Sequence, residues 1–127
     1  MTPDEILEVD ARRNYPPGTT AGNLRAIINE EARNRAAVVQ QGDTLITFKT
    51  AGGDENVEFH TFNADTPENL ANNVLMFFGM VKKMGYKTAS TSYENPKISS
   101  LFQKFVAPKY KVNIGKQDGQ YIAKVRL

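Results

Sequence analysis

Apolar positions recur along the chain with two different periods, and these periods predict its helices and strands. Residues 3–13 and 21–35 carry apolar side chains at helical spacing, which predicts two successive helices. Thr2 is suited to cap the first helix, with Glu5 three residues on. The intervening Tyr15-Pro-Pro-Gly18 separates the two helices, because proline cannot continue a helix.

Three strand-like segments follow the helical region. They cover residues 36–40, 44–50 and 56–63, and they are rich in β-branched and aromatic side chains. The turn-forming sequences Gln41-Gly42-Asp43 and Gly52-Gly53-Asp54 lie between them. Short turns join antiparallel neighbours, so these segments are predicted to form an antiparallel meander.

The most apolar helix is predicted between Asp65 and Gly85. We expect Asp65 to cap it and Glu68 to reach back in a capping box. Apolar side chains cover most of its circumference, so the helix is expected to be buried against the sheet. The apolar positions are Leu70, Val74, Leu75, Met76, Phe77, Phe78, Met80, Val81 and Met84.

The last third of the chain repeats the alternation of strand and helix. A strand is predicted at residues 86–93, a helix at 95–105, and a closing hairpin from strands 110–114 and 120–125. Asn95 is suited to the N-cap and Pro96 to the first helical position. No linker, internal repeat or low-complexity tract interrupts the pattern. Residues 1–127 are therefore predicted to form a single α+β domain with a mixed sheet.

The amino-acid composition excludes several kinds of functional site. A chain of 127 residues with 40% hydrophobic residues can bury one modest core. The absence of cysteine excludes a disulfide framework, a zinc–thiolate site and a thiol nucleophile. No run of 18 apolar residues predicts a membrane span, and the acidic N-terminus does not resemble a signal peptide. We therefore expect a cytoplasmic or otherwise reducing setting, and no membrane partner.

Charge is distributed unevenly along the chain. Residues 1–81 contain six basic and twelve acidic side chains, a net charge of −6, whereas residues 82–127 contain ten basic and two acidic ones, a net charge of +8. Such asymmetry can mark a surface for nucleic acid, phosphate or an acidic partner, and the alternative is a fold in which the two halves complement each other. The lysines that a nucleic-acid surface would use are Lys82, Lys83, Lys87, Lys97, Lys104, Lys109 and Lys111.

Glu58 and His60 are the sequence's candidates for proton transfer. They lie two residues apart on the strand predicted at 56–63, so their side chains share one face. Either could serve as a general base toward an amine. The alternative interpretation is a solvated strand face with no catalytic role. No Gly-x-Ser-x-Gly motif, Walker loop or His-x-x-x-His pair is present to suggest other chemistry.

The predicted order of elements, ααβββαβαββ, resembles that of the GNAT acetyltransferase superfamily without the family's first strand. The helix beginning at Asn95 is similar to the family's penultimate helix, through Ile98, Leu101, Phe102 and Lys104. The sequence Lys83-Met-Gly-Tyr86, which closes the long helix ahead of a strand, is also typical of the family. The resemblance implies a GNAT-like fold over the whole chain.

The chain departs from the family where the family binds acetyl-CoA. The resemblance implies a glycine-rich loop before the long helix, whose N–H groups hold pyrophosphate. The corresponding residues 62–70 contain no glycine, and Pro67 lacks an N–H group. Asp65 and Glu68 add negative charge there. In addition, Phe102 occupies the position at which the family commonly has a tyrosine that protonates the leaving thiolate.

Two functions follow from the resemblance. The first is a non-catalytic GNAT-like module with a structural or binding role and no cofactor, similar to small phage virion and accessory proteins, and placed in a virion or the host cytoplasm. The second is a divergent acetyl-CoA-dependent N-acetyltransferase, with Glu58 or His60 as base and Tyr93 supplying the missing hydroxyl. The alternative interpretation of Tyr93, as an aromatic at a strand end, is a packing residue. If acetyl-CoA binds, the candidate contacts are Phe62, Asn63, Thr66, Asn69 and Asn95.

The resemblance also leads to an expectation about partners. Without the family's first strand, one edge of the sheet is left for another chain to cover, so a protein partner or self-association is expected. Nucleic acid is a weaker alternative.

Overall fold

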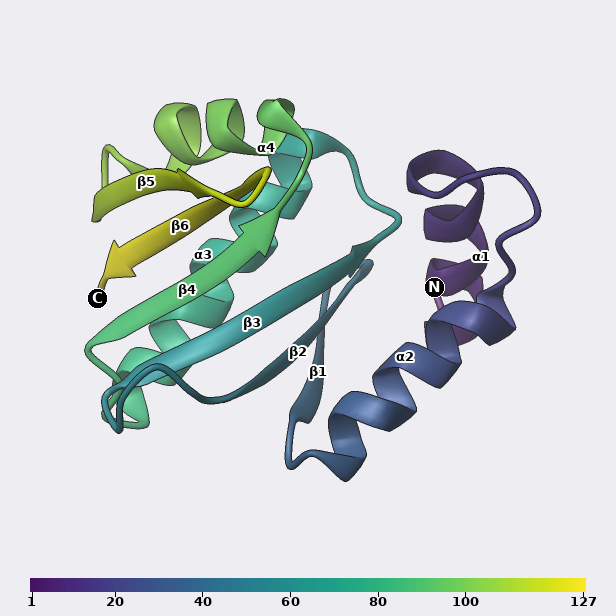
Figure 1. Ribbon diagram of the computed structural model, residues 1–127, viewed down its shortest axis with the longest axis horizontal. Coiled ribbons are helices and arrows are strands. Elements are labelled where there is room, and N and C mark those ends of the chain that lie inside the picture. Colours follow the sequence, from purple (N-terminus) through teal and green to yellow (C-terminus); the bar gives the residue numbers. More distant parts are fainter.

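The computed structural model of the chain describes residues 1–127, and the predicted order of helices and strands is confirmed (Figure 1). The helices are α1 (Pro3–Asn14), α2 (Ala21–Arg33), α3 (Pro67–Lys83) and α4 (Pro96–Leu101), which continues into the π-helix η1 (Phe102–Val106). The strands are β1 (Ala37–Gln41), β2 (Thr44–Thr50), β3 (Asn56–Asn63), β4 (Thr88–Tyr93), β5 (Lys111–Gln117) and β6 (Gln120–Arg126).

The six strands form one mixed sheet in the order β1-β2-β3-β4-β6-β5. All neighbours are antiparallel except β3 and β4, which pair in parallel over only three positions, from Asn56 opposite Thr88 to Glu58 opposite Ser90. Beyond these positions the two strands diverge, as their arrows show in Figure 1. The sheet is therefore divided into two halves that share a short parallel junction.

Helices cover both faces of the sheet. On one face, α3 packs on a core that draws side chains from β2, β3, β4 and β6. On the other face, α1 and α2 enclose a smaller core with Leu45 of β2 and Phe62 of β3. The alternation of side chains along each strand separates the two cores. In β3, for example, Val57 and Phe59 belong to the α3 core and Phe62 to the other.

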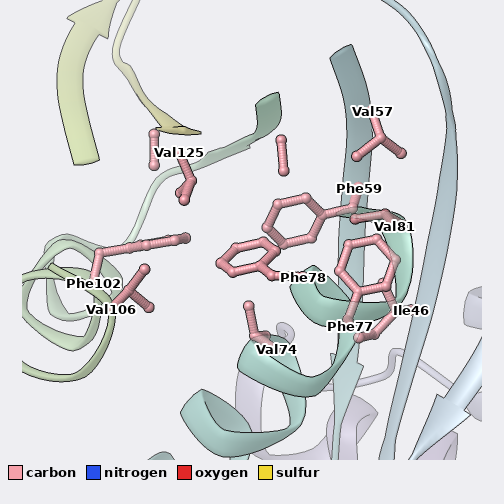
Figure 2. Packing of buried hydrophobic residues seen from close by; sticks show 12 residues of the cluster. Ile46, Val57, Phe59, Val74, Phe77, Phe78, Val81, Phe102, Val106 and Val125 are labelled. Carbon is pink, nitrogen blue, oxygen red and sulfur yellow. The ribbon is translucent and has the colours of Figure 1, made fainter. Parts of the chain in front are cut away.

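Aromatic rings make up the centre of the α3 core (Figure 2). The ring of Phe77 lies 5.3 Å from those of Phe48 and Phe59, measured between centroids. Phe78, the next residue, lies 5.5 Å from Phe59 and 5.7 Å from Tyr110. Offset and edge-on aromatic contacts of this kind add to the stabilisation from burial alone. This core also confirms that the long helix is buried against the sheet.

The ends of several elements differ from the sequence prediction. The helix predicted to reach residue 35 ends at Arg33, because Asn34 and Arg35 turn the chain and Arg35 has a φ of 71°. The helix predicted at 95–105 is α-helical only to Leu101. Its last turn widens into η1, in which the Ala107 N–H donates to the Phe102 carbonyl five residues back. The capping box of Thr2 and Glu5 is confirmed.

The outer edge of β1 pairs with no strand of this chain. Residues 1–127 thus contain no strand that covers this edge. None of the helices is both long enough and apolar enough to cross a membrane.

Asp10 is an acidic side chain inside the fold. It lies on the inner face of α1, is 3% exposed, and accepts a hydrogen bond of 2.7 Å from the Asn14 amide. Burial raises the pKa of the Asp10 carboxyl above its usual 3.8, although hydrogen bonds from Asn14 and from the Asn63 backbone act in the opposite direction.

We predict that Asp10→Asn stabilises the protein near neutral pH. Because the folded state raises the pKa of Asp10, its contribution to stability is complete below about pH 3.8 and is lost as pH rises through the folded-state pKa. The variant should therefore unfold at a higher temperature than the wild type at pH 7, and at nearly the same temperature at pH 3. Thermal unfolding followed by circular dichroism measures both. A variant less stable than wild type at pH 7 would contradict this account.

Candidate functional site

The opening of α3 is the place at which a GNAT-type phosphate site would lie. Thr66 is the N-cap, and its hydroxyl accepts the Asn69 N–H at 3.3 Å, while its carbonyl accepts the Leu70 N–H at 2.8 Å. Pro67 occupies the first helical turn and has no N–H to offer. Of the N–H groups that a helix start leaves free, that of Asn69 is therefore occupied by Thr66, and Pro67 contributes none.

The predicted capping box of Asp65 and Glu68 is wrong. Thr66, one residue later, is the cap, and Glu68 lies in the first turn without reaching back to the cap. The physical reason is that the Asp65 carboxylate has other donors: the backbone N–H of Asp43 at 2.9 Å and the side-chain amide of Asn73 at 2.7 Å. Asp43 lies 22 residues away, in the β1–β2 turn, and Asn73 lies eight residues away in α3, so the spacing of a capping box could not reveal them.

A hydrogen-bond network extends from Asp65 into the sheet. The Asn63 side-chain oxygen accepts the Asp65 N–H at 3.0 Å and the Thr44 hydroxyl at 2.8 Å, and the Asn63 amide donates to the Asp65 carbonyl. The Asn73 amide also donates to the Thr44 hydroxyl at 2.9 Å. We refer to these four residues, Thr44, Asn63, Asp65 and Asn73, as the α3-entry network. It joins β2, β3 and α3 at one point.

A tight β1–β2 turn makes room for this network. Gly42 has a φ of +56°, and a Cβ atom there would lie 2.8 Å from the Asn73 side-chain oxygen. The turn must therefore have a glycine at this position, both for its backbone and for space. The adjacent Asp43 also accepts a hydrogen bond from the N-terminal amino group at 3.0 Å.

The residues proposed to contact acetyl-CoA have other roles in the structure. Phe62 is buried in the core beneath α1, and Asn63 belongs to the α3-entry network. Thr66 and Asn69 are bonded to each other at the helix start. Asn95 caps α4 by accepting the Lys97 N–H at 3.0 Å, as predicted. The residues at this opening thus satisfy one another, and Asp65 and Glu68 place carboxylates beside it.

Tyr93 lies between two other aromatic side chains. Its ring is stacked on Phe102 and on Tyr121, with centroid distances of 6.0 and 5.6 Å. Its hydroxyl is 2.8 Å from the Ser99 hydroxyl. Burial raises the pKa of Tyr93, although the Ser99 hydrogen bond acts in the opposite direction. These contacts are those of a packing residue.

Glu58 and His60 lie together on the face of β3 that α2 covers, with the Glu58 carboxylate 3.7 Å from the His60 ring nitrogen. Tyr93 packs against the core on the opposite face. The structure therefore brings the two candidate bases together but keeps the candidate acid away from them. Phe102 is 6% exposed, and its side chain has no hydroxyl that could act as the acid.

A small polar hollow of about 50 Å³ lies beside Glu58 and His60. Thr47 and Glu31 also line it, and each has a buried oxygen without a hydrogen-bond partner. Sequence reasoning missed both residues. Thr47 could have been found, because the meander register places it directly opposite His60. Glu31 could not, since only the packing of α2 on the sheet brings it here. No group of His, Asp and Glu side chains is arranged to hold a metal ion.

The lysines proposed for nucleic-acid binding do not lie on one element. Lys82 and Lys83 end α3, Lys97 lies in α4, Lys104 in η1 and Lys111 in β5. Lys87 is 3.5 Å from Glu55, in an exposed ion pair. Nothing in this distribution forms a continuous stripe along a single helix or strand.

Solved acetyltransferase structures share this fold. The ribosomal-protein-alanine N-acetyltransferase of Brucella melitensis matches all of this chain and 97% of its own, with a TM-score of 0.60 and 11% identity. A Bacillus subtilis acetyltransferase, solved with CoA, matches 100% of this chain and 94% of its own, with a TM-score of 0.53 and 14% identity. A putative acetyltransferase of Salmonella typhimurium, solved with acetyl-CoA, matches 98% and 84%, with a TM-score of 0.53 and 13% identity.

The chain therefore has the GNAT acetyltransferase fold, as its sequence predicted. At these identities the likeness is one of fold. No protein-family model matches the sequence, and no curated protein matches it.

We predict that Asp65→Ala lowers the free energy of unfolding by about 2–3 kcal/mol, because it removes a charged acceptor from two buried or half-buried donors. Glu68→Ala is the matched control. Its side chain is exposed in the same helix opening, so it should change stability by less than about 1 kcal/mol. Urea unfolding of the three proteins tests the comparison. Equal effects of the two substitutions would show that the α3-entry network does not hold the fold.

Proposed function

We propose that this GNAT-fold chain has a structural or binding role and is not an acetyltransferase. The observation that supports this most is the opening of α3. A pyrophosphate site needs free backbone N–H groups at a helix N-terminus and a local positive field. Here the Thr66 hydroxyl occupies the Asn69 N–H, Pro67 has no N–H, and Asp65 and Glu68 carry negative charge.

The fit of acetyl-CoA to these residues is poor for a second reason. The Asp65 carboxylate is fixed by Asp43 and Asn73, so it cannot turn away from an incoming phosphate without breaking two hydrogen bonds. A fixed like charge within about 4–6 Å disfavours an anion. The residues at the opening of α3 therefore do not fit the pyrophosphate of acetyl-CoA.

The setting of such a module is also a proposal. A role in a phage virion, or as a phage accessory protein in the host cytoplasm, follows from the resemblance to small phage virion and accessory proteins. That reasoning is an analogy of fold, which hosts many functions.

Calorimetric titration with acetyl-CoA tests the proposal directly. We expect no heat of binding up to about 1 mM ligand, which corresponds to a binding free energy weaker than about 4 kcal/mol. A conventional GNAT enzyme titrated in the same buffer is the positive control. Saturable binding at micromolar concentration would overturn the proposal.

A divergent N-acetyltransferase is the second candidate, and the polar hollow favours it. Glu58 and His60 lie at and just beyond the point where β3 and β4 stop pairing, and the unpartnered oxygens of Thr47 and Glu31 lie beside them. A protonated amine donates hydrogen bonds and carries positive charge, so it suits a site of carboxylates and a hydroxyl. In this function Glu58 or His60 would take the proton that the amine loses.

An acetyl-transfer assay with a panel of primary amines separates the two candidates. Under our proposal, the wild type releases free CoA thiol no faster than buffer. Under the alternative, release is measurable and Glu58→Gln reduces it by a factor of about 100 or more. Glu55→Gln, an exposed neighbour whose carboxylate pairs only with Lys87, should leave it unchanged. Activity that both variants retain would point to a base other than Glu58.

A further inference from the structure

The two edges of the sheet differ in how they are protected. β5, at one edge, carries Lys111, Lys116 and Gly115 within seven residues. β1, at the other, has the sequence Ala-Val-Val-Gln-Gln, with no charge, proline or glycine. Exposed edge strands present unpaired N–H and C=O groups, and proteins usually guard them with charges, especially lysine, with proline or with bulges. β5 is guarded in this way, and β1 is not.

Apolar side chains are exposed beside the unguarded edge. Val38, in β1, is 44% exposed. Ile27, which is 45% exposed, lies on α2, the helix that contacts β1. Ile27 precedes Glu31 by one helical turn, and Val38 is paired with Thr47, so both side chains flank the same face of the sheet. We refer to Val38 and Ile27 as the apolar margin. It lies beside an uncharged strand edge.

The charges next to this margin sum to zero, because Arg25, Arg33 and Arg35 are matched by Asp4, Glu30 and Glu31, although Glu31 and Arg35 form no ion pair. On α2, Arg33 pairs with Glu30, and Arg25 pairs with Asp4 of α1. Two copies of this surface could therefore approach each other without strong repulsion between like charges. The same neutrality leaves no charge pattern that would select a different, oppositely charged partner.

We propose that β1 pairs antiparallel with β1 of a second copy of this chain, about a two-fold axis. With Val39 at the centre, it faces Val39 of the partner subunit, and Val38 faces Gln40 of the partner subunit. Strand addition at an edge satisfies the outward backbone groups of both chains at once. A two-fold axis closes the assembly at two copies, because the same edge is used by each. The paired strands join the two sheets into one.

A second copy fits this edge better than an unrelated strand. The five residues of β1 are small, apolar or amide side chains, so opposing them with themselves produces no steric or charged mismatch. The remaining edge, β5, carries Lys111 and Lys116, and lysine guards an edge strand against pairing, which disfavours a dimer there. This inference does not depend on whether the chain binds acetyl-CoA.

Light scattering coupled to size exclusion tests the proposal on the untagged full chain at about 5 and about 100 µM. We expect a mass at the higher concentration of twice the 14.1 kDa of one chain. Val38→Lys places a charge on an exposed position of the edge and should raise the dimer dissociation constant by about tenfold or more. Ile122→Lys is the matched control, because Ile122 is 38% exposed but lies on β6, which is not an edge strand. The Ile122→Lys variant should still form the dimer.

Amide hydrogen exchange gives a second readout that does not depend on mass alone. Those amides of residues 37–41 that point away from β2 should be protected in the wild type at 100 µM and lose that protection in Val38→Lys, while the α3 amides remain protected in both and show that the variant is folded. A mass of one chain at 100 µM would overturn the proposal. So would an assembly larger than two, or a doubled mass that Val38→Lys leaves intact.

Discussion

The packing of α3 across both halves of the sheet is the interaction on which the structure depends. β3 and β4 pair at only three positions, so backbone hydrogen bonds alone join the halves weakly. α3 makes up for this with two adjacent rings. Phe77 contacts Phe48 and Phe59 in the first half, and Phe78 contacts Phe59 and Tyr110 at the second. Burial of such rings contributes several kcal/mol each, which a three-residue ladder does not match.

The α3-entry network follows from that packing. Once α3 lies across the sheet, its first turns meet the β1–β2 turn, and Asn73 comes within reach of Thr44 and Asp65. The polar groups gathered there must be satisfied, and they satisfy one another. The resemblance to acetyltransferases implied that this corner of the fold would leave backbone donors for phosphate. Here it holds a carboxylate, and the corner serves the stability of the fold. That difference in the use of one helix terminus is the basis for our proposed function.

Much of the fold could be predicted from the sequence, because its signals are local. The turn glycines and β-branched runs predicted β2 and β3 to the residue, and Asn95 with Pro96 predicted the start of α4. The candidate site could be predicted less completely from the sequence. Asp65 was predicted to be a helix cap because its spacing from Glu68 matches a capping box. Its contacts with Asp43 and Asn73 depend on the folded structure and leave no such pattern in the sequence. Glu31 was missed for the same reason, as a residue of α2 whose partners lie on β2 and β3.

The sequence by itself determined which segments become helices and strands, that no thiol chemistry is present, and that a glycine-rich phosphate loop is absent. These properties depend on residue type and on spacing within a few residues. Only the tertiary structure decided that Glu58 and His60 share a hollow with Thr47 and Glu31, that Tyr93 lies on the opposite face, and that β1 is left as an uncharged edge. These properties depend on register and on helix packing, which join residues far apart in the chain and which local patterns do not encode.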